Sequence, residues 1–265
     1  MPASETLSSR RFDKIAENFA TSEVHRSSPT MAALHETLGP QKGSAICDVA
    51  CGAGHLALSF ADQDPARVVC VDPAPSMLES VRKLAAERQA AVETVQSVAE
   101  ELPFEDASFD LVVSRLAPHH FQDIRKAVGE MARLLRPGGR LAVIDLEGNA
   151  DPEIDALNHE LEILHDPTHV RSYTLDEWVG FLQGAGLNVP VARGGQAESR
   201  TGVPVRRWCE IASSGAEAEA AIRRRLAEVP AAHREALGIR QEGEEFFIPV
   251  RTCMVIGVKP LAGKE

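Results

Sequence analysis

A short apolar run followed by two closely spaced glycines constrains this chain more than any other feature. Residues 45–50 (Ala-Ile-Cys-Asp-Val-Ala) are apolar apart from one acid, which is typical of a strand buried on both faces of a parallel sheet. Gly52 and Gly54 break the run, and residues 55–61 follow as a helix. A glycine loop between a strand and a helix brings backbone amides close to a ligand. The sequence therefore predicts a strand–loop–helix unit with a ligand site at its turn.

Apolar runs and segments of helical period then alternate along the chain. We expect further strands at residues 67–71, 92–98, 109–114 and 140–146, with helices at residues 76–89 and 124–135 between them. The second of these helices should stop at Pro137-Gly138-Gly139. Beyond residue 150 we expect a helix capped by Asp151, a helix at residues 174–185, strands at 187–192 and 250–258, and helices within 203–238. Strands that alternate with helices predict a parallel sheet with helices on both faces.

The composition is that of a globular protein with an acidic surface. Apolar residues make up 44% of the 265 residues and charged residues 25%, and the net charge is -11. Such a surface repels phosphate backbones, so we expect no nucleic-acid partner. No segment has the roughly 20 apolar residues of a membrane span, and residues 1–18 do not resemble a signal peptide. The cysteines lack the spacing of zinc ligands, so we expect no metal and a cytoplasmic protein with reduced thiols.

Two acids near the glycine loop help to discriminate between cofactors. Gly52, Gly54 and Ala57 fit the looser dinucleotide pattern Gly-x-Gly-x-x-Gly/Ala. Asp72 also suits that fold, whose ribose-binding acid lies about 20 residues after the glycines. Asp48, however, ends the first strand, where its carboxylate would repel a pyrophosphate but attract a cation. S-adenosylmethionine carries an ammonium and a sulfonium and no phosphate, so the two acids favour it over NAD, although Asp48 could instead only cap the loop.

Four segments resemble the motifs of class I S-adenosylmethionine-dependent methyltransferases. Residues 48–54 resemble the first motif, and Asp72 matches the acid at the end of strand two. Residues 99–110 resemble the motif that reads the adenine edge, and residues 134–141 the motif that leads into strand five. The resemblance covers about residues 10–150 and is nearest to the ubiquinone/menaquinone-biosynthesis-like branch of small-molecule methyltransferases.

This resemblance implies a fold and a division of the chain. The expected fold is α/β: a Rossmann-like doubly wound sheet of seven strands, the last one antiparallel, with added helices that form a lid. Residues 1–30 should cover the cofactor, and residues 31–150 should form the S-adenosylmethionine-binding core. Residues 151–265 should complete the sheet and carry a helical insertion at about 196–249.

The resemblance also assigns the cofactor contacts. The expected cofactor-binding residues are the loop residues Asp48, Ala50, Cys51, Gly52 and Gly54 at the methionine part, Asp72 at the ribose, Pro73, Met77, Ala99 and Glu100 at the adenine, and Ser114 and Arg115 at the amino-acid end. Val98 replaces an acid of many relatives, so a backbone or Glu100 contact should take over at the adenine. Residues 12–19 resemble the cofactor-covering helix, with Phe19 where a tyrosine is common, but they also fit a plain amphipathic helix.

Two segments are candidates for the acceptor side. Residues 115–121 follow strand four, and ligands bind beyond the carboxyl ends of parallel strands. His119 and His120 are therefore candidate bases, of which at most one should be catalytic because adjacent side chains rarely point the same way. In residues 166–173, His169 is a further candidate base. The expected substrate-binding residues are His25, His169, Arg171 and Tyr173, which would suit an anionic or phenolic molecule. Both segments could instead be purely structural.

These inferences together predict an enzyme that moves a methyl group from S-adenosylmethionine to oxygen or activated carbon of a small molecule. A quinone precursor, a phenol or a specialised metabolite would fit as the acceptor. The alternatives are an S-adenosylmethionine-binding protein with a non-methylating role such as cyclisation, an NAD-dependent oxidoreductase, and a non-catalytic binding module. The expected partner is a small-molecule substrate, and the sequence allows a homodimer.

Overall fold

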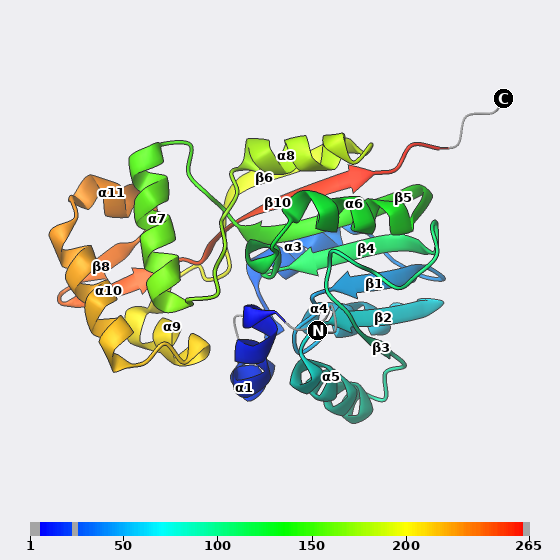
Figure 1. Cartoon of the computed structure of the whole chain (residues 1–265), viewed down its shortest axis with the longest axis horizontal. Coiled ribbons are helices and arrows are strands. Elements are labelled where there is room, and N and C mark those ends of the chain that lie inside the picture. The colour runs from blue at the N-terminus through cyan, green and yellow to red at the C-terminus, as the bar shows by residue number, and fades with distance from the viewer. Residues whose placement is uncertain (1–5, 23–25, 262–265) are drawn as a thin grey trace.

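One seven-stranded sheet organises the computed structural model, which describes residues 6–22 and 26–261. The strand order is β3-β2-β1-β4-β5-β10-β6 (Figure 1). The strands are β1 (Ala45–Val49), β2 (Arg67–Asp72), β3 (Glu93–Gln96), β4 (Phe109–Arg115), β5 (Leu135–Leu146), β6 (Asn188–Ala197) and β10 (Arg251–Val258). β10 runs antiparallel to both of its neighbours, whereas β1 to β5 pair in parallel. The prediction of a doubly wound sheet of seven strands with the last one antiparallel is therefore confirmed.

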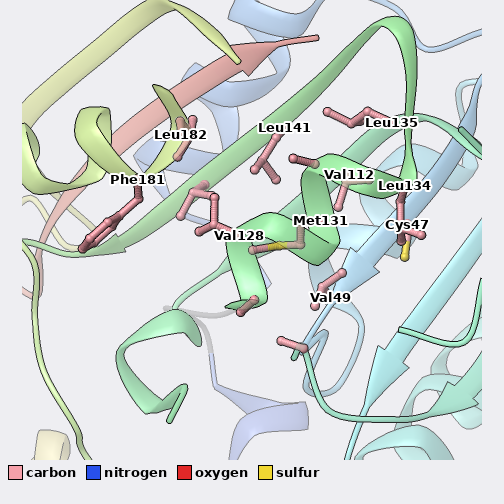
Figure 2. Packing of buried hydrophobic residues seen from close by; sticks show 14 of the residues in the cluster. Cys47, Val49, Val112, Val128, Met131, Leu134, Leu135, Leu141, Phe181 and Leu182 are labelled. Carbon is pink, nitrogen blue, oxygen red and sulfur yellow. The ribbon is translucent and has the colours of Figure 1, made fainter. Parts of the chain in front are cut away.

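Helices cover both faces of this sheet. One face packs against α6 (Ile124–Leu134) and α8 (Leu175–Gly184), and the buried side chains between them form the largest apolar cluster (Figure 2). The other face packs against α3 (Pro29–Leu38) and α4 (His55–Ala61), with α5 (Pro75–Arg88) beside α4. Alternate strand residues supply the two cores: Cys47 and Val49 face α6, and Ile46 faces α3 and α4. The continuous apolar runs of the sequence arise because both sides of each strand are covered.

A small lobe with its own apolar core follows the fifth strand. It contains the helices α7 (Pro152–His165), α9 (Val205–Ala212), α10 (Ala216–Glu228) and α11 (Ala231–Ala236). It also contains a three-stranded sheet, β7 (Val203–Pro204), β9 (Glu245–Ile248) and β8 (Arg240–Glu242), in that order. The sequence predicted only helices between residues 196 and 249, because β7 has two residues and β8 is exposed throughout. The division into residues 1–30, 31–150 and 151–265 stays a prediction, although α7 shares its core with the lobe.

The helix α1 (Leu7–Thr21) joins the lobe to the sheet-bearing part of the molecule. Its Asp13 Oδ1 accepts a hydrogen bond of 2.8 Å from Ser76 N at the start of α5. Its Asn18 Nδ2 donates to Ser213 Oγ at 2.9 Å, at the end of α9. α1 therefore spans the carboxyl-end edge of the sheet, where Figure 1 shows it between α9 and α5.

Local signals in the sequence set most helix ends. Thr174 and Glu177 form the expected capping box of α8, and the Asp151 side chain accepts from Glu153 N at the start of α7. α6 ends at Leu134, within one residue of the expected end and before Pro137-Gly138-Gly139. The expected strand at 140–146 begins earlier than predicted, because β5 already starts at Leu135 and its pairing with β4 shifts register across residues 136–139. Within the two described ranges, no helix is long and apolar enough to cross a bilayer.

Candidate functional site

A large cavity lies at the carboxyl ends of β1, β2 and β4. The sheet edge forms its floor, α1 lies over it, and α7 and α9 of the lobe close one end. Its empty volume, including the open mouth, is about 1570 Å³. The position of the cavity is the one where open α/β sheets bind ligands.

The glycine loop lies at the floor of the cavity. Ala50 and Gly52 have left-handed backbone conformations, with φ of 54° and 53°, and both line the cavity with Cys51. A Cβ on Gly52 would meet no atom within 4 Å, so open space lies beside this residue. Gly54 differs, because a Cβ there would lie 2.8 Å from Val81 Cγ2 and the residue does not line the cavity. The first glycine therefore leaves room for a ligand, and the second permits close packing of α5.

Two buried carboxylates flank this loop. Asp48, 1% exposed, accepts one hydrogen bond, from Ala57 N at 3.0 Å. Asp72, 6% exposed, accepts from Gly52 N at 2.8 Å and from Ala74 N at 2.9 Å. Burial raises the pKa of Asp48 to about 7, with a further contribution from Asp72, and burial raises the pKa of Asp72 to about 6. Neither carboxylate forms an ion pair with a side chain of the described ranges, so the floor of the cavity favours a cationic ligand.

Further residues that were predicted to bind the cofactor line the cavity beyond the glycine loop. Pro73, Met77, Ala99 and Glu100 line the cavity beyond Asp72. Glu100 Oε1 accepts from Gln122 N at 2.9 Å, so this carboxylate braces the loop after β4. Phe19 of α1 also lines the cavity, and its carbonyl accepts from His55 Nε2 at 3.1 Å.

At the end of β4, Ser114 and Arg115 have different roles. Ser114 is 1% exposed and its Oγ donates to Val49 O at 2.8 Å, so it joins β4 to β1 and does not reach the cavity. Arg115 lines the cavity and its Nη2 donates to Glu198 Oε2 at 2.6 Å and to Ser28 Oγ at 3.0 Å. The buried Glu198 therefore fixes the direction of the arginine.

His119 and His120 both line the cavity, with ring centroids 4.2 Å apart. The premise that adjacent side chains point apart is wrong here, because Pro118–His120 forms a single 3-10 turn, η1, and both rings line the same cavity. That at most one of the two histidines is catalytic stays a prediction. His119 Nδ1 lies 2.6 Å from Oδ1 of Asp145, an acid of β5 with no exposed surface. His120 Nδ1 donates to Thr168 O at 3.0 Å. Burial lowers the pKa of both histidines to about 4, so both rings are neutral at pH 7.

The lobe adds a third histidine and an acid to this end of the cavity. His169 is 5% exposed, and neither ring nitrogen has a hydrogen-bond partner in the described chain. Its ring stacks at 5.4 Å from that of His119. Glu162 and His165 of α7 line the same end, with His165 Nδ1 3.6 Å from Glu162 Oε2. This end of the cavity thus combines the neutral imidazoles of His119, His120 and His169 with the Glu162 carboxylate, and the described residues include no group suited to hold a metal ion.

The comparisons with known proteins agree with this geometry. Residues 47–143 match a family model described as "Methyltransferase domain". The chain is 37% identical over 170 residues to the uncharacterized methyltransferase YcgJ of Bacillus subtilis, an alignment that covers 63% of this chain and 66% of that protein. This chain belongs to the class I S-adenosylmethionine-dependent methyltransferase family.

A second relative and the crystal structure of YcgJ bear on this family assignment. The chain is 38% identical over 138 residues to the ubiquinone/menaquinone biosynthesis C-methyltransferase UbiE of Paracoccus denitrificans, covering 51% of this chain and 54% of that protein. The crystal structure of YcgJ superposes with a TM-score of 0.76 at 28% identity, over 88% of this chain and 99% of that one. The sequence alignments with the curated relatives span about two thirds of their length or less.

The family's cofactor is S-adenosylmethionine, and the residues present fit it. Asp72 can accept hydrogen bonds from ribose hydroxyls, and the Asp48 carboxylate can attract the positive charge of the cofactor. Gly52 leaves open space above the loop. A pyrophosphate would meet two buried carboxylates at this place, which counts against NAD.

Several predicted residues lie elsewhere. The structure brings Gly54 and Ser114 close to the cavity but behind its wall. Arg171 and Tyr173 do not line it: Arg171 pairs with Glu177 at 2.8 Å, and Tyr173 packs among the aromatic rings beside α8. They line a separate pocket between the start of α6 and α8, because the chain leads into α8 after His169. His25 lies outside the described residues.

Proposed function

We propose that this protein transfers the methyl group of S-adenosylmethionine to a hydroxyl oxygen or an acidic carbon of a small molecule, with His119 as the general base. The observation that carries the proposal is the 2.6 Å contact between His119 Nδ1 and Asp145 Oδ1. His119 lines the same cavity as Asp48 and Asp72, and Asp145 lies behind it. A quinone precursor, a phenol or a specialised metabolite would present such an acceptor.

Both acceptor types lose a proton when they are methylated. The bound cofactor supplies an activated methyl group, so the chain has to position the acceptor, exclude water and remove that proton. Asp145 occupies Nδ1 of His119, so Nε2 is the ring nitrogen left for the cavity. Phe12 of α1 packs edge-on against His120 with ring centroids 5.0 Å apart, so the helix covers the histidine end of the cavity.

The protonation of the His119–Asp145 pair follows from its burial. Burial raises the pKa of Asp145 well above its ordinary value and lowers that of His119, so the pair favours the state with no net charge. In that state Nε2 of His119 carries a hydrogen and cannot act as a base. Loss of one proton leaves a carboxylate that accepts from Nδ1–H and a bare Nε2. The fraction of His119 with a bare Nε2 therefore increases as the pH rises, and the rate of methyl transfer should increase with it.

Asp145→Asn tests this assignment. The asparagine amide can donate to Nδ1, which holds the hydrogen on Nε2 in the wrong tautomer for a base. We expect kcat for transfer of labelled methyl to a panel of phenols, catechols and hydroquinones to fall by about 10²- to 10⁴-fold. Affinity for S-adenosylhomocysteine should change less than about twofold, since the pair lies apart from the glycine loop.

A matched control and the pH profile complete the experiment. His233→Gln removes an imidazole from α11, outside the cavity, and should leave kcat unchanged. The rate increase with pH should be present in the unsubstituted protein and in His233→Gln, and absent in Asp145→Asn. Full turnover by Asp145→Asn would show that positioning alone drives the reaction. Cofactor binding with no methyl transfer to any panel member would instead favour the non-methylating alternative.

A further inference from the structure

Glu162 stands out at the acceptor end because its carboxylate has no strong partner. Its side chain is 13% exposed and lines the cavity from α7. Its one titratable neighbour within 4 Å among the described residues is His165, whose Nδ1 lies 3.6 Å from Glu162 Oε2, a distance longer than a hydrogen bond. No lysine or arginine within residues 6–22 and 26–261 forms an ion pair with it.

His165 is itself already engaged. Its Nε2 donates to Trp208 O at 3.1 Å, and its ring stacks on the indole of Trp208 with centroids 3.8 Å apart. Since Nε2 carries the hydrogen, Nδ1 can donate to Glu162 only when the ring is an imidazolium. Burial raises the pKa of the Glu162 carboxyl, whereas a proton on His165 or on the neighbouring histidines lowers it below its ordinary value. With His119 and His169 neutral, no lysine or arginine of the described chain compensates an ionised Glu162, so a cationic ligand would stabilise it.

His169 supplies a second, independent observation. This side chain is 95% buried, lines the cavity, and has two ring nitrogens without a hydrogen-bond partner in the described chain. Burial, followed by the effect of His119, lowers its pKa to about 3, so the ring is neutral and offers one donor and one acceptor. Buried polar groups are nearly always paired, so a ligand is the natural partner of this ring.

The arginines near the cavity do not suit an anionic acceptor. Arg115 contacts Glu198 at 2.6 Å, and Arg11 Nε lies 3.1 Å from Asp166 Oδ1. Each arginine therefore has a carboxylate of the protein as its partner. The lobe and the segment before β10 also contribute apolar side chains to the cavity wall, namely Val203, Trp208, Ile211 and Val250.

We propose that this end of the cavity binds a protonated amine of the methyl acceptor, with the ammonium group donating to the Glu162 carboxylate and to the bare ring nitrogen of His169. The apolar wall from the lobe packs against the hydrocarbon or aromatic body of the same molecule. This inference rests on the proposed function and narrows its substrate class to small molecules with an amine as well as a methylatable hydroxyl or carbon. It departs from the anionic acceptor that His169, Arg171 and Tyr173 suggested in the sequence.

Three phenols that differ only in their end group test the proposal. Tyramine carries an ammonium, tyrosol a hydroxyl and 4-hydroxyphenylacetate a carboxylate. Calorimetry would measure their affinities for the full chain saturated with S-adenosylhomocysteine. We expect tyramine to bind at least about tenfold more tightly than tyrosol, because a charge-assisted hydrogen bond replaces a neutral one, and 4-hydroxyphenylacetate to bind most weakly.

Substitutions then assign the preference to Glu162. Glu162→Gln should reduce the preference for tyramine over tyrosol to less than about twofold, whereas Glu162→Asp, which keeps the charge, should retain most of it. Glu153→Gln removes an exposed acid from the first turn of the same helix and serves as the matched control. Thermal melts would show that each variant is folded. If Glu162→Gln does not fold, the amine preference of Glu162→Asp can still be compared with that of the unsubstituted protein.

The possible failures can be told apart. Equal or tighter binding of tyrosol or 4-hydroxyphenylacetate would overturn the amine proposal, and so would an unchanged preference in Glu162→Gln. Binding of S-adenosylhomocysteine with no binding of any of the three phenols would also overturn it. The proposed methyl transfer is tested separately by Asp145→Asn, and it fails if the protein does not bind S-adenosylhomocysteine at all.

Discussion

Replacing Asp48 with asparagine should make the cofactor-free protein more stable while weakening cofactor binding. Asp48 is 1% exposed and its pKa is raised from 3.8 to about 7, first by burial and then by Asp72. Each unit of pKa corresponds to about 1.4 kcal/mol, so the ionised carboxylate costs the folded state about 4 kcal/mol at pH 8. Asparagine carries no charge and can still accept the hydrogen bond from Ala57 N.

The pH dependence of this effect has a definite sign. A carboxyl whose pKa is higher in the folded state binds its proton more tightly when folded. Its contribution to the free energy of unfolding is therefore lost as the pH rises from about 4 to about 7. Asp48→Asn removes this loss, so its stability advantage should be larger at pH 8 than at pH 5, by about 2 to 3 kcal/mol.

Urea unfolding of the cofactor-free proteins at pH 5 and pH 8 measures this difference directly. Asp62→Asn, which removes an exposed acid at the end of α4, is the control and should show no such pH-dependent gain. In the same preparations, S-adenosylhomocysteine should bind to Asp48→Asn about tenfold more weakly or worse, because the charge that favours a cation is gone. If the stability advantage of Asp48→Asn were no larger at pH 8 than at pH 5, it would refute the claim that burial destabilises the ionised form of Asp48.

Two further substitutions test the predicted role of Asp72 in cofactor binding and the role of Gly54 in packing. Asp72→Ala should weaken binding of S-adenosylhomocysteine by tenfold or more, or about 1.4 kcal/mol, and an affinity within twofold of the unsubstituted value would show that the ribose assignment is wrong. Gly54→Ala should lower the free energy of unfolding by about 1 to 3 kcal/mol, because φ is 80° and the added Cβ would lie 2.8 Å from Val81 Cγ2. Gly129→Ala, where a Cβ would meet nothing within 4 Å, is its control in α6 and should be neutral or slightly stabilising in the same thermal melts.

The sheet and the cofactor end of the cavity could be predicted because their signals are local. Strands buried on both faces appear as continuous apolar runs, in which Asp48 is the one acid near the end of β1 and Asp72 is the last residue of β2. The capping box at Thr174 and Glu177 fixed the start of α8 in the same way. These features depend on neighbours within a few residues, which a sequence displays.

The acceptor end could be predicted only in part, because it is built from distant segments. The apolar stripe of α7 was evident, but its polar face gave no sign that Glu162 and His165 point into a cavity and not into solvent. That orientation depends on how the lobe packs. Asp145 did leave a signal, since an acid within the apolar run of β5 needs a buried partner, and His119 is that partner.

The cavity above the glycine loop should hold S-adenosylmethionine and not a dinucleotide. Calorimetric titration of the purified protein with S-adenosylhomocysteine and, in parallel, with NADH distinguishes the two cofactors. The buried carboxylates predict saturable one-to-one binding of S-adenosylhomocysteine and no measurable binding of NADH. Tight binding of NADH with none of S-adenosylhomocysteine would contradict it.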